Sequence, residues 1–289
     1  MKALIAEKLR HIGDESSIIS IQPIAGGDIN QAYYVETAKE IYFIKANRNV
    51  PQNFFQAEAE GLQRIQETNT IHVPNVYHYD NTSNTDMQVL ILEWIEGKSH
   101  ANTARQLGEN LARLHSAEVG EKYGFNQTTF VGELTQNNQF HSSWTSYYRD
   151  QRLIPQFERA LEKGRMPQKR KKQMESLFEK MEHLVPQHPG VSLLHGDLWG
   201  GNWIVGPKGT PYVIDPSVLY GDRAFEIAFT ELFGGFPRDF YQAYQEHLRL
   251  PDDYQDVKPL YQLFYLLVHL NLFGEAYGSA VDRILGYYV

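Results

Sequence analysis

The segment from Leu193 to Val205, LLHGDLWGGNWIV, is the most informative stretch of this chain for its fold. Its apolar ends read as two short strands, and the glycine-containing loop between them carries Asp197 and Asn202, five positions apart. An aspartate can accept or orient the proton of an attacking hydroxyl, whereas an asparagine amide one loop turn away can coordinate a metal ion. The spacing therefore predicts one loop that supplies both a catalytic carboxylate and a metal ligand.

A second carboxylate follows the loop on an apolar strand. Residues 212–214, Tyr-Val-Ile, read as that strand and lead into Asp215, thirteen residues after Asn202. Magnesium keeps several of its waters and takes only one or two protein carboxylates. We therefore expect Asp215 and Asn202 to be the metal ligands.

A lysine and a glutamate upstream extend the pattern. Residues 41–45 alternate as a strand and end on Lys45, and Glu58 follows thirteen residues later in a stretch with helical spacing. In kinases such a lysine holds the α- and β-phosphates of ATP and is fixed by a helix glutamate. Glu60 is an alternative partner, but Glu58 places the apolar residues of the helix better toward a core.

The order of these residues along the chain is typical of an ATP-dependent kinase. The turn Gly26-Gly27 lies between two expected strands ahead of Lys45, and its backbone N–H groups could cover the phosphates. A glycine pair alone is usually a hairpin, and a single strand lysine is usually exposed. The combination at this spacing predicts ATP and Mg²⁺ as cofactors and Asp197 as the catalytic residue.

Two regions of different secondary structure are expected. Residues 1–96 read as strands with one long helix, whereas the chain after the Glu96-Gly97 break is mainly helical with a short β-type region at 191–214. The expected strands are 17–24, 32–35, 41–45 and 89–94, and the expected helices are 54–66, 103–115, 142–163, 168–184, 222–234, 237–248 and 258–273. This pattern predicts an α+β chain with a bilobal protein-kinase-like fold. The lobe 1–96 would bind ATP, and the lobe 97–289 would hold the catalytic loop and the acceptor site.

Composition limits the class of protein. The 289 residues are 42% hydrophobic and 21% charged, as in ordinary globular proteins. The absence of cysteine excludes disulfides, thiolate metal sites and a cysteine nucleophile. The N-terminus lacks the apolar core of a signal peptide, and the apolar stretch 260–273 is too short to span a bilayer. We expect a cytoplasmic protein that does not bind membranes.

The net charge of −8 opposes nucleic-acid binding, because the phosphate backbone requires a positive surface. The run Lys169–Lys172, KRKK, is the exception. Charge runs are usually the solvated face of a helix, and a docking patch is the alternative.

His195 precedes the loop and could suggest a general base. Its position after two leucines favours an inward, hydrogen-bonded role instead. Asp197 is the better base, because an aspartate is already ionised at neutral pH. The histidines of the chain also lack the clustering of a metal-dependent hydrolase.

Departures from protein kinases favour a small acceptor. Gly196 stands where protein kinases carry an arginine that pairs with a phosphorylated activation loop. Asp215 is followed by proline rather than Phe-Gly, and no Ala-Pro-Glu segment follows. Phosphorylation-controlled access of a protein substrate is therefore unsupported.

Two motifs resemble those of the fructosamine (ketosamine) kinases, relatives of the aminoglycoside and choline phosphotransferases. HGDLWGGN at 195–202 resembles the family's HGDLW-x-GN, and DPSVLYGDRAFEIAFTELFGGF at 215–236 resembles its DP-x-x-YGDRE-x-D-x-x-x-TELFGGF. The HGD-x-x-x-x-N pattern is shared widely, whereas LW and YGDR…ELFGGF are specific. The resemblance covers nearly the whole chain, including Lys45 and the hinge-like stretch 92–95.

The resemblance implies transfer of the ATP γ-phosphate to the 3-hydroxyl of a ketoamine, the rearranged adduct of a sugar with an amine. The product is unstable and sheds the sugar, so the family is associated with deglycation. The resemblance also implies nucleotide contacts at Glu93, Trp94 and Ile95 and an acceptor contact at Trp199, whose ring could stack on a sugar or a cationic amine. Asp222 is a further hypothesis for an acceptor-binding carboxylate.

Alternatives remain open. An aminoglycoside- or choline-type phosphotransferase would perform the same reaction on another acceptor, although YGDR…TELFGGF weighs against it. A non-catalytic nucleotide-binding scaffold is disfavoured, because decayed kinases usually lose one of the residues for catalysis or for nucleotide and metal binding. All four are intact here: Lys45, Asp197, Asn202 and Asp215. Phe225 and Glu226 stand near where relatives place Glu and Asp, which leaves substrate detail open. The sequence does not reveal which sugar and amine are used, whether the ketoamine is free or protein-bound, or the oligomeric state.

Overall fold

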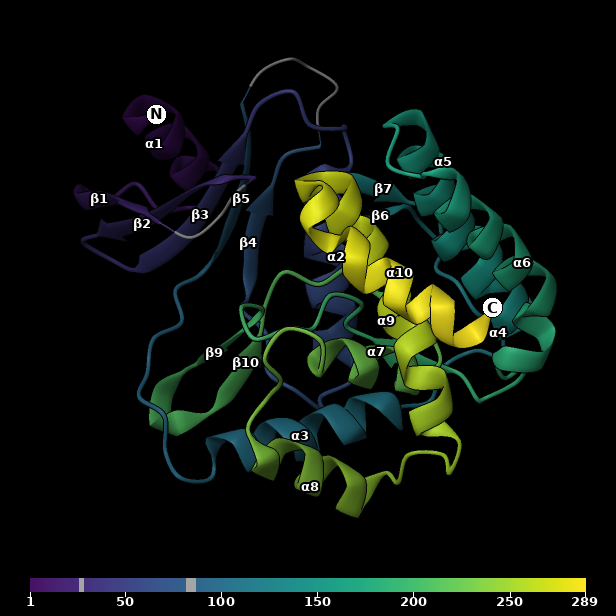
Figure 1. Cartoon of the computed structure of the whole chain (residues 1–289). Coiled ribbons are helices and arrows are strands. Elements are labelled where there is room, and N and C mark those ends of the chain that lie inside the picture. Colours follow the sequence, from purple (N-terminus) through teal and green to yellow (C-terminus); the bar gives the residue numbers. More distant parts are fainter. Residues whose placement is uncertain (26–28, 82–86) are drawn as a thin grey trace. The chain divides into compact units, whose positions relative to one another are not determined.

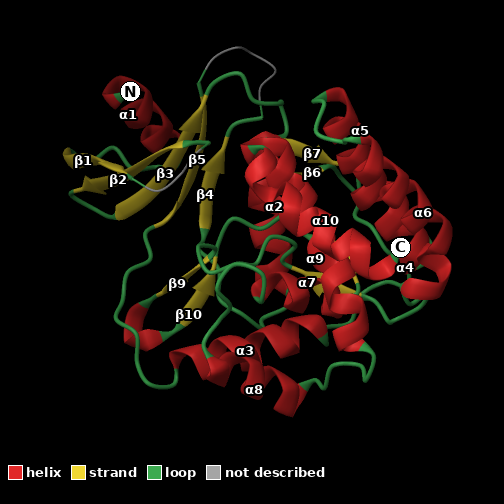
Figure 2. Cartoon of the chain, viewed as in Figure 1, coloured by secondary structure: helices red, strands yellow, loops and turns green. Residues whose placement is uncertain are grey.

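A computed structural model describes residues 1–25, 29–81 and 87–289, so the predicted phosphate-covering turn at Gly26 and Gly27 lies outside the described residues. The chain divides into two compact units. The first comprises Met1–Thr103 and Trp203–Pro216, and the second comprises Ala104–Asn202 and Ser217–Val289. Strands prevail in the first unit and helices in the second (Figure 2). The division of roles between residues 1–96 and 97–289 stays a prediction, and the compact units differ from it mainly by placing 203–216 in the first.

A five-stranded antiparallel sheet forms most of the first unit, in the order β1-β2-β3-β5-β4 (Figure 1). The strands are β1 (Ile18–Ile24), β2 (Gln31–Thr37), β3 (Ile41–Asn47), β4 (Val76–Tyr79) and β5 (Gln88–Glu93). Four of them lie where the alternation of apolar residues predicts strands. Strand β4 was not predicted, because a run of four residues is too short to show a clear period.

Alternation along β3 places its side chains on opposite faces of the sheet. Ile44 and Ala46 are buried on the face covered by helix α1 (Lys2–His11), in one core with Ile5 of that helix. Lys45 lies between them and therefore points to the other face, where it meets helix α2 (Phe54–Glu67). The same period that builds the core thus directs the lysine away from it.

A two-stranded ribbon belongs to the first unit. It consists of β9 (Trp203–Val205), the 3-10 helix η2 (Pro207–Gly209) and β10 (Pro211–Val213). The segment before helix α3 (Thr103–His115) packs tightly on this ribbon: a Cβ at Gly97 would lie 1.8 Å from the Gly206 carbonyl oxygen. In addition, Thr103 Oγ1 donates a hydrogen bond of 2.8 Å to the Gly209 carbonyl. These contacts join the ribbon to residues 97–103 and explain why residues 203–216 belong to the first unit.

Helices dominate the second unit. They are α3 (Thr103–His115), α4 (Trp144–Tyr147), the π-helix η1 (Tyr148–Leu153), α5 (Ile154–Glu162), α6 (Gln168–Leu184), α7 (Arg223–Thr230), α8 (Arg238–His247), α9 (Tyr254–Phe273), the 3-10 helix η3 (Glu275–Tyr277) and α10 (Gly278–Tyr288). The short antiparallel pairs are β6 (Thr129–Val131) with β7 (Leu134–Gln136), and β8 (Ser192–Leu194) with β11 (Leu219–Gly221).

Most predicted helices are present, and the differences have physical causes. Helix α7 ends at Thr230, earlier than predicted, and Gly234 and Gly235 follow with positive φ. Helix α9 begins at Tyr254, before the predicted start at residue 258. The prediction placed the start too late, because a proline such as Pro259 is typical of the first turn of a helix, whereas here it lies inside the helix. Helix α10 was not predicted.

The basic run 169–172 corrects one expectation. Lys169 and Lys172 are exposed, as a solvated helix face requires, but the Arg170 side chain is only 2% exposed. It forms ion pairs with Glu275 at 2.6 Å and Asp282 at 2.7 Å. The arginine therefore points inward, because acidic partners from η3 and α10 lie beside α6.

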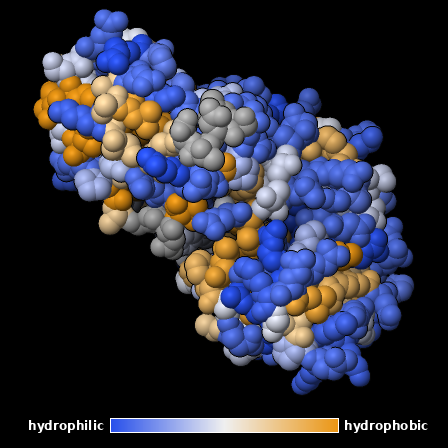
Figure 3. Space-filling view, turned by 90° about the horizontal axis from the view of Figure 1, so that it is seen from above, coloured by the Kyte–Doolittle hydropathy of each residue, from blue (hydrophilic) through white to orange (hydrophobic). Residues whose placement is uncertain are grey.

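The core of the second unit is aromatic. Buried Trp144 stacks on Tyr148 with ring centroids 5.9 Å apart, and Phe225 of α7 stacks on Tyr265 of α9 at 5.2 Å. On the face drawn in Figure 3, apolar surface is divided into separate areas by polar residues. Within the described ranges, no helix combines the length and the apolar character needed to cross a membrane.

Candidate active site

A buried lysine in the first unit pairs with two carboxylates. Lys45 Nζ lies 2.8 Å from Glu58 Oε1 and 2.6 Å from Asp215 Oδ1. The lysine side chain is 7% exposed and that of Asp215 is 40% exposed. The structure thus joins residues of β3, α2 and the segment after β10, and it confirms Glu58 rather than Glu60 as the partner of the lysine.

One ammonium group balances two acids in this cluster. Burial lowers the pKa of Lys45, but Asp215 and Glu58 outweigh that effect and raise it above its usual range. Burial raises the pKa of Glu58 despite the opposing charge of Lys45, and Asp215 adds to the rise. Lys45 therefore stays protonated, and the partly exposed carboxylate of Asp215 has the chemistry of a hard oxygen ligand for a cation such as Mg²⁺.

Asp215 has an uncommon backbone conformation. Its φ is 57°, in the left-handed region, and Pro216 follows it. A proline disfavours the right-handed helical region for the preceding residue, and aspartate tolerates the left-handed one better than most residues. Such conformations cluster at functional sites, and this one directs the carboxylate toward Lys45.

The hinge-like residues follow β5 in the first unit. The Glu93 carboxylate accepts hydrogen bonds from the side chain of Asn75 at 2.8 Å and from its backbone N–H at 3.1 Å. The Trp94 ring meets Tyr34 edge-on with centroids 4.9 Å apart. Glu93, Trp94 and Ile95 are partly buried, and their role in nucleotide binding stays a prediction.

The two residues of the predicted catalytic loop, Asp197 and Asn202, lie in the second unit and are in direct contact. Asn202 Nδ2 donates to the Asp197 carbonyl at 2.8 Å and to Asp197 Oδ2 at 3.0 Å. Because the amide uses its nitrogen in these bonds, Oδ1, the atom able to bind a metal, is not involved in them. The carboxylate and the amide predicted from their spacing therefore form one hydrogen-bonded pair.

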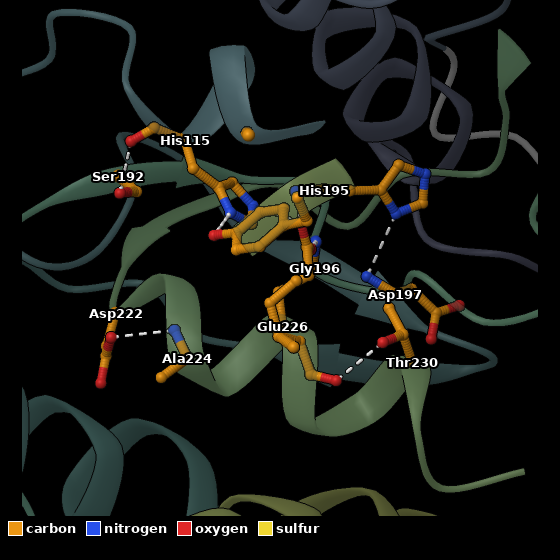
Figure 4. A network of polar contacts seen from close by, with 12 residues as sticks. His115, Ser192, His195, Gly196, Asp197, Asp222, Ala224, Glu226 and Thr230 are labelled. Atoms are coloured by element: carbon orange, nitrogen blue, oxygen red, sulfur yellow. Dashed lines mark hydrogen bonds and ion pairs between the residues drawn. The ribbon is translucent and has the colours of Figure 1, made fainter. Parts of the chain in front are cut away.

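A buried carboxylate holds the backbone of this loop (Figure 4). Glu226 of α7 is fully buried, and its carboxylate accepts from the Gly196 N–H at 2.6 Å and from the His195 N–H at 3.2 Å. His115 Nε2 lies 2.8 Å from the same carboxylate, and its Nδ1 lies 2.8 Å from Tyr244 Oη. Burial raises the pKa of Glu226, but its hydrogen bonds and the nearby histidines outweigh that effect and lower it. An ionised Glu226 therefore anchors the loop.

Sequence reasoning missed this role of Glu226. The signal in the sequence was a charged residue inside the apolar stretch FEIAF. In the structure every residue from Ala224 to Thr230 is buried. A charged side chain on a helix with no exposed face requires hydrogen-bonding or charged partners in the core.

Gly196 is required by the backbone of the loop. Its φ is +84°, and a Cβ there would lie 1.9 Å from the Ser217 carbonyl oxygen. The Ser217 N–H donates to the His195 carbonyl at 2.8 Å, which fixes that approach. His195 is fully buried, in agreement with the inward role expected for it. No larger residue fits at 196, and this explains the departure from protein kinases.

The two predicted acceptor residues have different environments. The Trp199 side chain remains 43% exposed. Asp222 is 2% exposed, caps α7 by accepting from the Ala224 N–H at 2.9 Å, and accepts from Tyr261 Oη at 2.5 Å. The expectation of an acceptor contact at Asp222 is therefore not supported, because the core and the helix end use both carboxylate oxygens.

Comparison with known proteins assigns the family. The model of the family described as "Fructosamine kinase" matches residues 1–289. The chain belongs to the fructosamine kinase family. A probable ketoamine kinase of Enterococcus faecium is 39% identical over 265 residues, which cover 91% of this chain and 93% of the relative.

Solved structures support the fold of this fructosamine kinase family member. The crystal structure of a candidate fructosamine-3-kinase from Haemophilus somnus matches with a TM-score of 0.87 at 28% identity, covering 99% of this chain and 95% of that one. An aminoglycoside phosphotransferase in complex with AMP-PNP and hygromycin B matches with a TM-score of 0.70 at 14% identity, covering 99% and 97%, and shows a shared fold alone. The kinase-like α+β fold is confirmed, and the family makes this protein a phosphotransferase.

Proposed function

We propose that this member of the fructosamine kinase family transfers the γ-phosphate of ATP to the 3-hydroxyl of a ketoamine, with Asp197 as the catalytic residue. The observation that carries the proposal is the contact between Asp197 and Asn202 on a loop anchored by Glu226. The relatives named as ketoamine kinases support the class of acceptor. The choice of the 3-hydroxyl rests on the resemblance of HGDLWGGN and YGDR…TELFGGF to the family's motifs.

Lys45 and Asp215 would serve the nucleotide. The buried ammonium of Lys45 suits phosphate oxygens, and the carboxylate of Asp215 and the amide oxygen of Asn202 suit Mg²⁺. When bound, the metal neutralises charge that develops on the phosphates. Glu58 would keep Lys45 in place once Asp215 turns to the metal, since Lys45 pairs with both acids.

Asp197 would serve the acceptor. It accepts the proton of the 3-hydroxyl while the hydroxyl oxygen bonds to the γ-phosphorus, and the bond from that phosphorus to the β–γ bridging oxygen breaks to release ADP. Asn202 holds Asp197 Oδ2 by a hydrogen bond of 3.0 Å, so the carboxylate does not need to reorient during the step. The phosphorylated product would then shed its sugar and free the amine, which is a deglycation.

An acceptor panel tests the proposal. Ribulosyl-lysine, fructosyl-lysine, choline and an aminoglycoside are compared with Mg·ATP by ATP consumption and by the delayed appearance of inorganic phosphate. We expect a ketoamine to have the highest kcat/KM, with ribulosyl-lysine ahead of fructosyl-lysine, and delayed phosphate with ketoamines only. A higher kcat/KM for choline or the aminoglycoside would overturn the acceptor, and no phosphorylation of any acceptor would overturn the kinase reaction.

A further inference from the structure

We infer that Gly201 is a positioning residue for the acceptor, because the lack of a side chain at 201 allows the indole of Trp199 to lie against the turn that links Asp197 to Asn202. This inference rests on the proposed function for the identity of the acceptor. It assigns to Gly201 the placement of the Trp199 ring on the loop that carries the proposed catalytic carboxylate.

The turn itself does not require glycine. The Asn202 N–H donates to the Trp199 carbonyl at 2.9 Å, which closes a turn with Gly200 and Gly201 at its centre. Neither glycine has a φ in the left-handed region. Other residues can adopt such a backbone, so conformation alone explains neither glycine.

The two glycines differ in which atoms an added Cβ would meet. A Cβ at Gly201 would lie 2.4, 2.5 and 2.9 Å from Cη2, Cζ2 and Cζ3 of the Trp199 ring. A Cβ at Gly200 would meet no described atom within 4 Å. The obstacle at 201 is thus the far edge of one indole, which can move, rather than backbone, which cannot.

The ring is well placed for recognition. Trp199 is 43% exposed, although its neighbour Leu198 is fully buried and Asn202 nearly so. An indole has a flat, apolar, electron-rich face that suits the ring face of a sugar or the cationic amine of a ketoamine. Trp199 lies two positions after Asp197, in a loop that Asn202 closes by hydrogen bonds to the backbone carbonyls of both residues.

A methyl group at 201 should therefore act on the acceptor alone. To restore ordinary carbon–carbon contacts of about 3.5–4.0 Å, the indole must move by roughly 1 Å or more. Loss of one stacking contact corresponds to about a 2- to 30-fold change in binding. We expect Gly201→Ala to raise the acceptor KM within that range, with the ATP KM changed less than about twofold.

A double-mutant cycle provides the test, with Gly200→Ala as the matched control. Gly201→Ala, Trp199→Ala and the double variant are compared with wild type in steady-state kinetics and in tryptophan emission and acrylamide quenching. We expect Gly200→Ala to match wild type. We also expect Gly201→Ala to alter both the acceptor KM and the emission, and to have no further effect in the Trp199→Ala background. Gly201→Ser should reproduce Gly201→Ala if the obstacle is steric.

Two results would overturn the inference. One is equal kinetics and emission for Gly201→Ala and Gly200→Ala, and the other is a Gly201→Ala effect that persists without Trp199. The emission and quenching measurements need no acceptor. If wild type phosphorylates no ketoamine, the proposed function fails, whereas the placement of Trp199 by Gly201 is still decided by those spectra.

Discussion

Asp197 is held in place at the level of single atoms. Its carbonyl and one carboxylate oxygen accept hydrogen bonds from the same amide of Asn202. The N–H groups of His195 and Gly196, just before it, bind the buried Glu226. The orientation of the carboxylate is therefore determined before substrate binds, which is the condition for effective proton acceptance.

Asp197→Asn should fold normally and lose most of its turnover. An asparagine keeps the shape of the side chain but cannot accept the proton, and proton transfer by a positioned group contributes about 10²–10⁴-fold. The measurement is kcat with the best acceptor of the panel, together with the thermal unfolding midpoint. Asp252→Asn, at a side chain that is 92% exposed, is the control. Wild-type kcat in Asp197→Asn would remove Asp197 from the mechanism.

Asp14 shows how a single residue couples stability to pH. Its buried carboxylate accepts from Ser16 Oγ at 2.6 Å, Thr37 Oγ1 at 2.7 Å and Tyr42 Oη at 3.0 Å. Burial raises its pKa, but these hydrogen bonds outweigh burial and lower the pKa from 3.8 to about 2.

The lowered pKa of Asp14 determines how the stability of the fold changes with pH. The unfolded chain binds this proton more readily than the folded chain, so Asp14 stabilises the fold above about pH 4 and this contribution is lost as the pH falls toward about 2. A shift of this size corresponds to about 2–3 kcal/mol. We expect urea titrations to show a smaller difference between wild type and Asp14→Asn at pH 2.5 than at pH 7. The exposed neighbour Glu15 supplies the control Glu15→Gln, and an equal Asp14→Asn difference at both pH values would contradict the assignment.

At the scale of elements, Arg170 joins α6 to the C-terminal helices. Its guanidinium bonds to Glu275, Asp282 and the Arg165 carbonyl, and these partners keep the pKa of the arginine above its usual range, with the Asp282 hydrogen bond as the largest cause. Gly278 leaves room for the cluster, since a Cβ there would lie 2.0 Å from Glu275 Oε1. One buried side chain thus fixes the position of η3 and α10 on α6.

Arg170→Ala should lower the free energy of unfolding by about 1.5–3 kcal/mol, because it removes the packing of a buried side chain and its hydrogen bonds to two carboxylates, those of Glu275 and Asp282, that stay 62% and 47% exposed. Hydrogen exchange should rise first in α10. Lys169→Ala and Lys172→Ala, on the same helix but exposed, should change stability by less than about 0.5 kcal/mol. A similar small effect for Arg170→Ala in urea titrations would show that α10 is held by its apolar contacts alone.

At the scale of the whole molecule, ligand binding should stabilise the folded chain. A ligand that binds only the native state at 100 times its Kd adds about 2.7 kcal/mol. We expect AMP-PNP with Mg²⁺ to raise the thermal midpoint of wild type. Lys45→Ala should weaken this effect at every Mg²⁺ concentration, because it removes the proposed phosphate contact. Asp215→Asn should weaken it mainly at low Mg²⁺, because it removes the proposed metal ligand but keeps a residue that tolerates the left-handed backbone.

The two variants also serve as a check on the placement of the nucleotide. Glu60→Gln, at the helix residue that does not contact Lys45, is the control and should behave like wild type. Midpoint shifts equal to wild type in both Lys45→Ala and Asp215→Asn, at low and high Mg²⁺, would mean that the nucleotide is bound elsewhere.

Features that depend on short periods and local spacing could be predicted from the amino-acid sequence. Strand alternation directs Lys45 away from the core, helical spacing places Glu58 to meet it, and the five-residue interval brings Asn202 onto Asp197. Each of these depends on residues near one another in the chain or on the period of a single element. The order of Lys45, Glu58, Asp197, Asn202 and Asp215 was therefore enough to predict the fold, and the motifs at 195–202 and 215–236 were enough to predict the family.

Which polar residues turn inward could not be predicted from the sequence and became evident in the folded chain. Glu226, Asp222 and Arg170 resemble surface residues in the sequence, and each is buried because a partner from a distant element meets it: His115, Tyr261 and Asp282. A buried charge is tolerated only when partners complete its hydrogen bonds, and those partners lie 111, 39 and 112 residues away in the chain. No local period encodes such pairings, so packing alone separates an anchor such as Glu226 from a residue that faces substrate.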